Sequence, residues 1–247
     1  MSRRDKVERK KIKVAAFQLP SQADYSDNLD RLLSLIEEHR DKGVIVAPEV
    51  YLTAYDYAHL ESAAEFSAKA LERLKEVVDE QIVVLTMILK EGDGFVNRAV
   101  VIHKHTVVYQ QKKAILFKLG EEDRYLEAGN TQDIMPFEID GVKYALLICF
   151  ELRFKELWKQ IEDVDIVLIP ARWGLPRKPH LEILSRALAV MNQCYVIVAN
   201  SSDADMASSS AIISPDGEVV QDDESSVIEG LVDFHTIKKI RRYIVMK

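Results

Sequence analysis

Apolar side chains along this chain follow two different periods, and the alternation between the two periods outlines a fold. Residues 12–19 (IKVAAFQL) are largely apolar and end at Pro20, which predicts a buried strand. Residues 27–40 then carry leucine and isoleucine at intervals of three and four, which predicts an amphipathic helix. Together the two segments form the first strand-helix unit.

The same two patterns continue to the end of the chain. Gly92 and Gly94 mark a hairpin turn in a strand-rich middle, and the run from Pro215 to Gly217 marks another turn. Further helices are predicted at residues 64–79, 154–161 and 180–193. Further strands are predicted at residues 44–47, 82–89, 95–102, 106–111, 142–149, 165–169, 195–199, 211–214 and 227–232.

Strands that alternate with helices toward both ends, with hairpins between, predict an α/β fold in which mixed sheets carry helices on their outer faces. The sequence contains no internal repeat, low-complexity tract or long linker. Residues 13–247 are therefore expected to form a single domain, preceded by a basic tail at residues 1–12.

Composition narrows the classes of function. The net charge of -7 argues against a surface built for nucleic acid, because such surfaces concentrate lysine and arginine. No apolar run approaches the roughly 18 residues that a membrane span needs. Two cysteines suffice neither for a disulfide framework nor for a four-thiolate metal site, so a reducing, cytoplasmic location is expected.

Cys149 is the first candidate for chemistry. It stands where an apolar strand gives way to a charged segment, at the strand end where α/β sheets place their ligands. A turn or helix beginning there would supply backbone N–H groups that stabilise a thiolate or an oxyanion. A lone cysteine is more often a buried packing residue, and Cys194, between a helix and the strand YVIVA, is interpreted in that way.

Charged side chains stand at comparable strand ends. Glu49 follows VIVAP, where a carboxylate is costly unless it is partnered and where burial suits it to general-base work. Lys112 and Lys113 end another strand, and alternation allows only one of them to face a shared site. Glu121 and Glu122 follow in a loop. Each of these residues read alone is more often a solvated surface residue.

Two other kinds of site compete with this interpretation. His103 and His105, on one face of a strand by alternation, suggest either a cysteine-histidine enzyme of protease type or a two-histidine metal site. Neither site is completed by a neighbouring cysteine, aspartate or second motif, so both rank behind the cysteine-glutamate-lysine grouping.

Taken together, six segments occur in the order and spacing of the nitrilase superfamily of carbon-nitrogen hydrolases, which the chain resembles from Lys13 onward. The most specific segment is the one around Cys149, where a cysteine is followed by an aromatic residue, an acid, a variable residue, an arginine and a phenylalanine. Ser208 or Ser209 departs from the pattern, since glycine is common there. The six segments are AAFQL, VAPE, a KxxLF-type segment, CFELRF, IPARW and NQCYVIVAN.

The resemblance implies a four-layer αββα sandwich and a metal-independent hydrolase without a cofactor. Cys149 would be the nucleophile, Glu49 the general base and Lys113 the oxyanion-stabilising cation, with Glu122 as a second glutamate. It further implies a small-molecule amide substrate and a homodimer or larger homo-oligomer. The resemblance also places Phe150, Trp173 and Arg153 in the substrate pocket, with the Phe150 N–H holding the oxyanion and Arg153 available for a substrate carboxylate.

The same motifs leave other activities open. Carbamoyl-amine hydrolases and nitrilases share them, and a catalytically silent scaffolding member would retain the fold. Trp173 could equally cover the sheet edge, and Arg153 could form a local ion pair. An amidase that acts on a small, carboxylated amide through a cysteine thioester is the function expected from the sequence.

Overall fold

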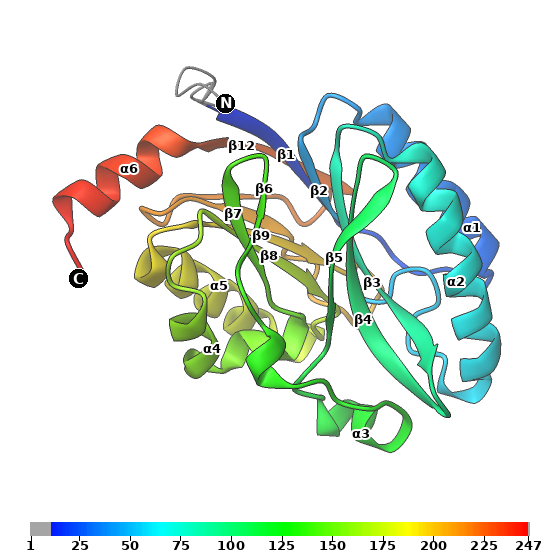
Figure 1. Cartoon of the computed structure of the whole chain (residues 1–247). Coiled ribbons are helices and arrows are strands. Elements are labelled where there is room, and N and C mark those ends of the chain that lie inside the picture. Colours follow the sequence, from blue (N-terminus) through cyan, green and yellow to red (C-terminus); the bar gives the residue numbers. More distant parts are fainter. Residues whose placement is uncertain (1–10, 247) are drawn as a thin grey trace.

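The computed structural model describes residues 11–246, and these form two six-stranded sheets. Each sheet has parallel strands in its centre and antiparallel strands toward its edges, and the two sheets pack face to face (Figure 1). Sheet A has the order β12 (Val227–Asp233), β1 (Lys11–Phe17), β2 (Val44–Val46), β3 (Ile82–Glu91), β4 (Gly94–His103) and β5 (Thr106–Lys112). Sheet B has the order β11 (Val219–Gln221), β10 (Ala211–Ile213), β9 (Tyr195–Asn200), β8 (Ile166–Ala171), β7 (Val142–Leu146) and β6 (Phe137–Ile139).

Helices cover the outer face of each sheet. Helices α1 (Tyr25–Glu38) and α2 (Leu60–Val77) lie on sheet A, and α4 (Lys155–Gln160) and α5 (Lys178–Asn192) lie on sheet B (Figure 1). The short α3 (Glu122–Tyr125) lies beyond the end of β5. This arrangement confirms the predicted αββα sandwich.

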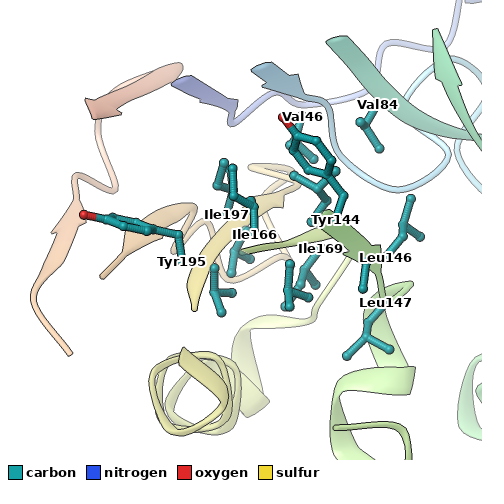
Figure 2. Close-up of a cluster of buried hydrophobic side chains, with 14 of the residues drawn as sticks. Val46, Val84, Tyr144, Leu146, Leu147, Ile166, Ile169, Tyr195 and Ile197 are labelled. Carbon is teal, nitrogen blue, oxygen red and sulfur yellow. The ribbon is translucent and has the colours of Figure 1, made fainter. Parts of the chain in front are cut away.

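The helices form where the sequence gives them an apolar stripe and a capped start. The Asp24 side chain accepts a hydrogen bond from the Ser26 N–H and so caps α1, whose leucines and Ile36 face sheet A. Side chains of Val46 and Val84 from sheet A gather with Tyr144 and Ile197 from sheet B in one buried cluster, which Figure 2 shows. Burial of this kind supplies most of the free energy that holds the two sheets together.

Several boundaries differ from those predicted. Helix α2 begins at Leu60, and β7 ends at Leu146, so Cys149 lies beyond the strand and opens a 3-10 turn, Cys149–Arg153. Residues 1–10 of the basic tail predicted at residues 1–12 lie outside the described residues. The last two residues of that prediction, Lys11 and Ile12, belong to β1.

Two strands and two α-helices were missed. Strands β6 and β11 have only three residues each, too few for an alternation to register, and α3 has only four. Helix α6 (Phe234–Tyr243) was missed although its apolar residues recur every three positions, at Phe234, Ile237 and Ile240, and it extends away from the sandwich after β12 (Figure 1). None of the helices within residues 11–246 is both long enough and apolar enough to cross a bilayer.

Candidate active site

The candidate residues meet at one edge of the sandwich because their strands end there. Glu49 follows β2, Lys113 follows β5, and Cys149 follows β7 in the opposite sheet. Strand β5 is antiparallel to β4, which is antiparallel to β3, so β5 runs in the same direction as β2 and ends at the same edge. The juxtaposition of sheets A and B then brings Cys149 to the residues of sheet A.

A buried chain of charges forms the centre of the site. Lys113 Nζ lies 2.8 Å from Glu49 Oε1 and 2.6 Å from Glu122 Oε1, and all three side chains are almost wholly excluded from solvent. Glu49, Glu122 and Cys149 line one cavity. Glu49, Lys113 and Cys149, which are far apart in the sequence, are therefore brought to one site.

The structure distinguishes between the neighbouring candidates. Lys113 points inward, whereas Lys112 lies on the other face and pairs with Glu91 at 2.9 Å. Glu121 adopts a left-handed conformation with φ of 59° and pairs with Arg124 outside the cavity. Glu122 opens α3 and turns inward, where its Oε2 accepts a hydrogen bond from the Phe117 N–H.

Two residues that the sequence did not indicate complete the surroundings of Glu49. The Tyr55 hydroxyl donates to Glu49 Oε1 at 2.7 Å, and Asn97 Nδ2 donates to the same oxygen at 2.8 Å. Together with Lys113, these groups give Oε1 three donors. The other oxygen, Oε2, is buried without a hydrogen-bond partner among the described residues. A buried, unpaired carboxylate oxygen is costly, so its freedom suggests a role in the reaction.

The buried groups influence one another's protonation. Burial alone would lower the pKa of Lys113, but the Glu49 and Glu122 carboxylates outweigh burial and raise it, so the ammonium stays charged. Burial raises the pKa of Glu122, and Lys113 opposes that rise. Burial and the Glu49 carboxylate raise the pKa of the Cys149 thiol well above its ordinary value. Lys113 and the Arg172 backbone N–H lower this pKa, but their effect is smaller. Cys149 at rest is therefore a thiol, and a base would be needed to make it a nucleophile.

Cys149 stands on a tight, strained bend. Its φ of 48° is in the left-handed region, which costs a residue with a side chain about 1–3 kcal/mol. The bend follows β7 directly, and it exposes a small part of an otherwise buried residue to the cavity. Cys149 therefore borders the cavity at a strained bend.

A small pocket adjoins Cys149 and has a cationic lining. Arg153 lies over the Trp173 ring at 4.7 Å, and Arg177 lies over the Phe117 ring at 5.2 Å. Within residues 11–246, neither guanidinium is paired with a carboxylate. A third arginine in the lining, Arg172, is neutralised by Asp203 at 2.6 Å. The unpaired positive charge favours an anionic ligand.

The remaining predicted pocket residues also lie here. Phe150 lines the pocket, and its ring packs against Phe117 and Phe154. Trp173 lines it as well, but its backbone N–H already donates to Asn200 Oδ1 at 2.7 Å, so the Trp173 ring faces the pocket as the support for Arg153.

The competing histidine interpretation does not fit the geometry. His103 ends β4 and His105 lies in the following turn, where Lys104 and His105 both have positive φ, so the predicted shared strand face is wrong. His103 is buried beside the Gln81 carbonyl, and His105 is exposed. No group of three metal-ligating side chains occurs in the described part of the chain.

Cys194 serves as the internal reference for Cys149. It is fully buried in the apolar core beside β9, and burial raises its pKa to about 12. It lines none of the cavities that contain the charged cluster. The second thiol is a packing residue, as expected.

Comparison with known proteins yields one consistent result. The family model of carbon-nitrogen hydrolases matches residues 13–242. A 2-oxoglutaramate amidase of Bacillus subtilis is 30% identical over 233 residues, which cover 89% of each chain. The omega-amidase YafV of Escherichia coli K12 is 27% identical, covering 85% of this chain and 84% of that one. The structure of Nit3 from Saccharomyces cerevisiae, a member of the nitrilase superfamily, superposes with a TM-score of 0.80 at 21% identity, covering 96% of each chain.

Proposed function

The chain belongs to the carbon-nitrogen hydrolase family, and on that premise we propose that it hydrolyses the amide of a small, carboxylated substrate through a thioester on Cys149. The observation that carries this proposal is the burial of Glu49, Lys113 and Glu122 in one chain of contacts on the cavity that also exposes Cys149. Base, cation and nucleophile are then available to a single carbonyl carbon.

The first step forms a carbon-sulfur bond. Glu49 takes the thiol proton on its unpartnered oxygen as the Cys149 sulfur attacks the amide carbon. The carbonyl π electrons move to oxygen and give a tetrahedral oxyanion. Lys113 and the Phe150 N–H stabilise that charge, and fixed donors in a buried site are effective there because they need no rearrangement.

The second step breaks the carbon-nitrogen bond. The oxyanion collapses, Glu49 returns its proton to the nitrogen, and ammonia or an amine leaves the thioester. Water then gives a proton to Glu49 and attacks the thioester carbon, and the carboxylic acid departs as the Cys149 thiol is restored. Glu122 holds the Lys113 ammonium at 2.6 Å throughout, which keeps the cation directed at the reacting centre.

The pocket favours a substrate that carries a carboxylate. Arg153 and Arg177 supply two guanidinium groups without acidic partners among the described residues, beside the nucleophile. Arginine matches a carboxylate through paired N–H donors. Relatives with the names 2-oxoglutaramate amidase and omega-amidase agree with such a substrate. We therefore assign the substrate to the ω-amides of short dicarboxylic acids, including 2-oxo acids.

Ammonia release across a panel of compounds tests this function. Carboxylated amides are expected to react fastest, ahead of neutral amides, carbamoyl amines and nitriles, and Cys149→Ser is expected to abolish release. Faster reaction of a carbamoyl amine or a nitrile would select one of the alternative activities. A scaffolding role would be indicated by the absence of turnover together with equal labelling of Cys149 and Cys194 by iodoacetamide.

We also propose that the protein is a cytoplasmic homodimer. Both cysteines are free, which suits a reducing compartment. Helix α5 and the edge strand β11 leave apolar side chains exposed on the outside of sheet B, and we call this surface the α5–β11 face. A second copy of the chain is the proposed occupant, as the resemblance to the superfamily implies. The α5–β11 face consists of Ile183, Val190, Met191 and Val219.

A further inference from the structure

Glu151 is a buried acid that the proposed mechanism does not use. It lies two residues after Cys149 and has no exposed surface. Its Oε1 accepts a hydrogen bond from the Ala114 N–H at 2.7 Å, and its Oε2 accepts one from the Ile148 N–H at 2.7 Å. The two donors directly follow Lys113 and directly precede Cys149.

These contacts join the two sheets at the active site. Lys113 continues β5 of sheet A, whereas Cys149 follows β7 of sheet B. One carboxylate therefore holds the segment of the cation and the segment of the nucleophile at a fixed separation. Bonds from ionised carboxylates to backbone N–H groups are short and about twice as strong as neutral ones.

The same carboxylate supports the strained bend at Cys149. The Glu151 N–H donates to the Ile148 carbonyl at 3.0 Å while Glu151 Oε2 accepts from the Ile148 N–H, so a closed ring of two hydrogen bonds encloses the bend. The left-handed conformation of Cys149 lies inside that ring. Loss of the ring would allow the sulfur to move away from Glu49.

We propose that Glu151 is a positioning residue whose ionised carboxylate fixes Cys149 and Lys113 relative to each other. This inference rests on the proposed thioester mechanism. Glu151 touches neither substrate nor reacting atoms, and it acts through the backbone on either side of it.

Ionisation of Glu151 falls in an accessible pH range. Burial raises the pKa of Glu151 to about 7. The N–H groups of Ile148 and Ala114 and the charge of Lys113 lower this pKa and so limit the rise. The titratable groups that face Glu151 are Lys113, Tyr109 of β5 and Cys149, and burial also raises the pKa of Tyr109. As the pH falls through about 7, Glu151 would become protonated, and its protonated oxygen would be a donor that faces a backbone N–H. The hydrogen bond from either Ala114 or Ile148 would then be lost.

Glu151→Gln tests the inference, because the amide keeps the shape but can accept only one of the two N–H groups. We expect kcat to fall about 10- to 100-fold, as the loss of a charged hydrogen bond implies, with KM within twofold. In the wild type, we expect kcat to decline as the pH falls from 8 to 6. In the variant, we expect kcat to change less over the same pH range. Wild-type kcat in the variant, or an unchanged pH dependence, would overturn the proposal.

Two further variants separate positioning from stability. Gln111→Met removes another buried contact between the sheets, from Gln111 Nε2 to the Leu146 carbonyl at 3.2 Å, and should lower the Tm while kcat stays within twofold. Glu151→Asp keeps the charge on a shorter side chain and should recover part of kcat together with the pH dependence.

If Glu151→Gln does not fold, Glu151→Asp alone tests the proposal. A lowered Tm together with wild-type kcat in Glu151→Asp would overturn it. Absence of amidase activity in the wild type would instead refute the proposed function.

Discussion

At the scale of single residues, Glu49 presents its two carboxylate oxygens to different surroundings. Oε1 accepts from Tyr55, Asn97 and Lys113, whereas Oε2 has no partner among residues 11–246. Donors concentrated on one oxygen fix the orientation of the carboxylate and leave the lone pairs of the other oxygen free. We interpret this asymmetry as the reason that a single glutamate can act as base in both half-reactions.

Asn97→Leu removes one of these donors with little change of volume. Loss of a hydrogen bond to a charged group costs about 1.5–3 kcal/mol, so kcat/KM at neutral pH should fall about 10- to 100-fold. Measurement of kcat/KM at neutral pH checks this, and an unchanged kcat/KM would contradict the assigned role.

Arg177→Met tests the pocket charge. The KM for a carboxylated amide should rise about 10- to 100-fold through loss of a charge-assisted contact, while kcat should change little. The KM for a neutral amide such as propionamide should stay within twofold. Arg73→Met, on the exposed surface of α2, is the matched control and should leave both substrates unaffected. Equal losses for both amides would show that Arg177 serves the fold and not recognition of charge.

Sequence reasoning at this scale found the charged residues but not their neutral partners. Glu49, Lys113 and Cys149 stand at strand ends within recognisable segments, and alternation limited the choice between Lys112 and Lys113 without deciding it. Tyr55 and Asn97 carry no comparable signal, because only the folded register places Asn97 opposite Glu49. The position of Arg177 likewise depends on the course of the loop before α5.

At the scale of elements, the turns show where the backbone is strained. The turn between β4 and β5 contains Lys104 and His105, both with positive φ, in place of the glycine or asparagine that such tight hairpins favour. The turn between β3 and β4 instead uses Gly92, with φ of 60°. The sequence predicted the Gly92 turn correctly, and the gap between the predicted strands at residues 95–102 and 106–111 marked the reversal that contains His105.

Lys104→Gly and Gly92→Ala should have opposite effects. A residue with a side chain in the left-handed conformation is strained by about 1–2 kcal/mol, and glycine relieves that strain. Glycine also increases the conformational entropy of the unfolded chain, which offsets part of the gain. We expect Lys104→Gly to raise the free energy of unfolding by about 0.5 kcal/mol and Gly92→Ala to lower it by about 1 kcal/mol. Urea unfolding measures both, and destabilisation by Lys104→Gly would contradict the turn geometry.

At the scale of the whole molecule, the site exists only because two sheets pack together. The order of strands and helices was predictable from hydrophobic periodicity, and the sandwich followed from the resemblance to a known superfamily. The contacts between the sheets, including those of Glu151 and Gln111, involve backbone groups that carry no sequence signal. Strands β6 and β11 were missed because they are too short to show a pattern, whereas α6 was missed although its apolar residues recur at helical spacing.

The proposed dimer is also a property of the whole molecule. Met191→Glu places a charge on the α5–β11 face, where Met191 is 56% exposed. If that face is buried between two copies, the mass in solution should fall from twice the chain mass to the chain mass. Light scattering after gel filtration measures this. Lys69→Glu on the exposed side of α2 is the control and should leave the mass unchanged, and an unchanged mass in Met191→Glu would contradict the assignment of the face.

The central claim is that Cys149 carries the acyl group of the substrate, and acid quenching during turnover followed by mass spectrometry tests it most directly. The account predicts an acyl increment on the peptide that contains Cys149, none on the peptide that contains Cys194, and loss of the increment once the amide is consumed. Sustained hydrolysis of the amide with no increment on Cys149, and with full activity retained in Cys149→Ser, would contradict it.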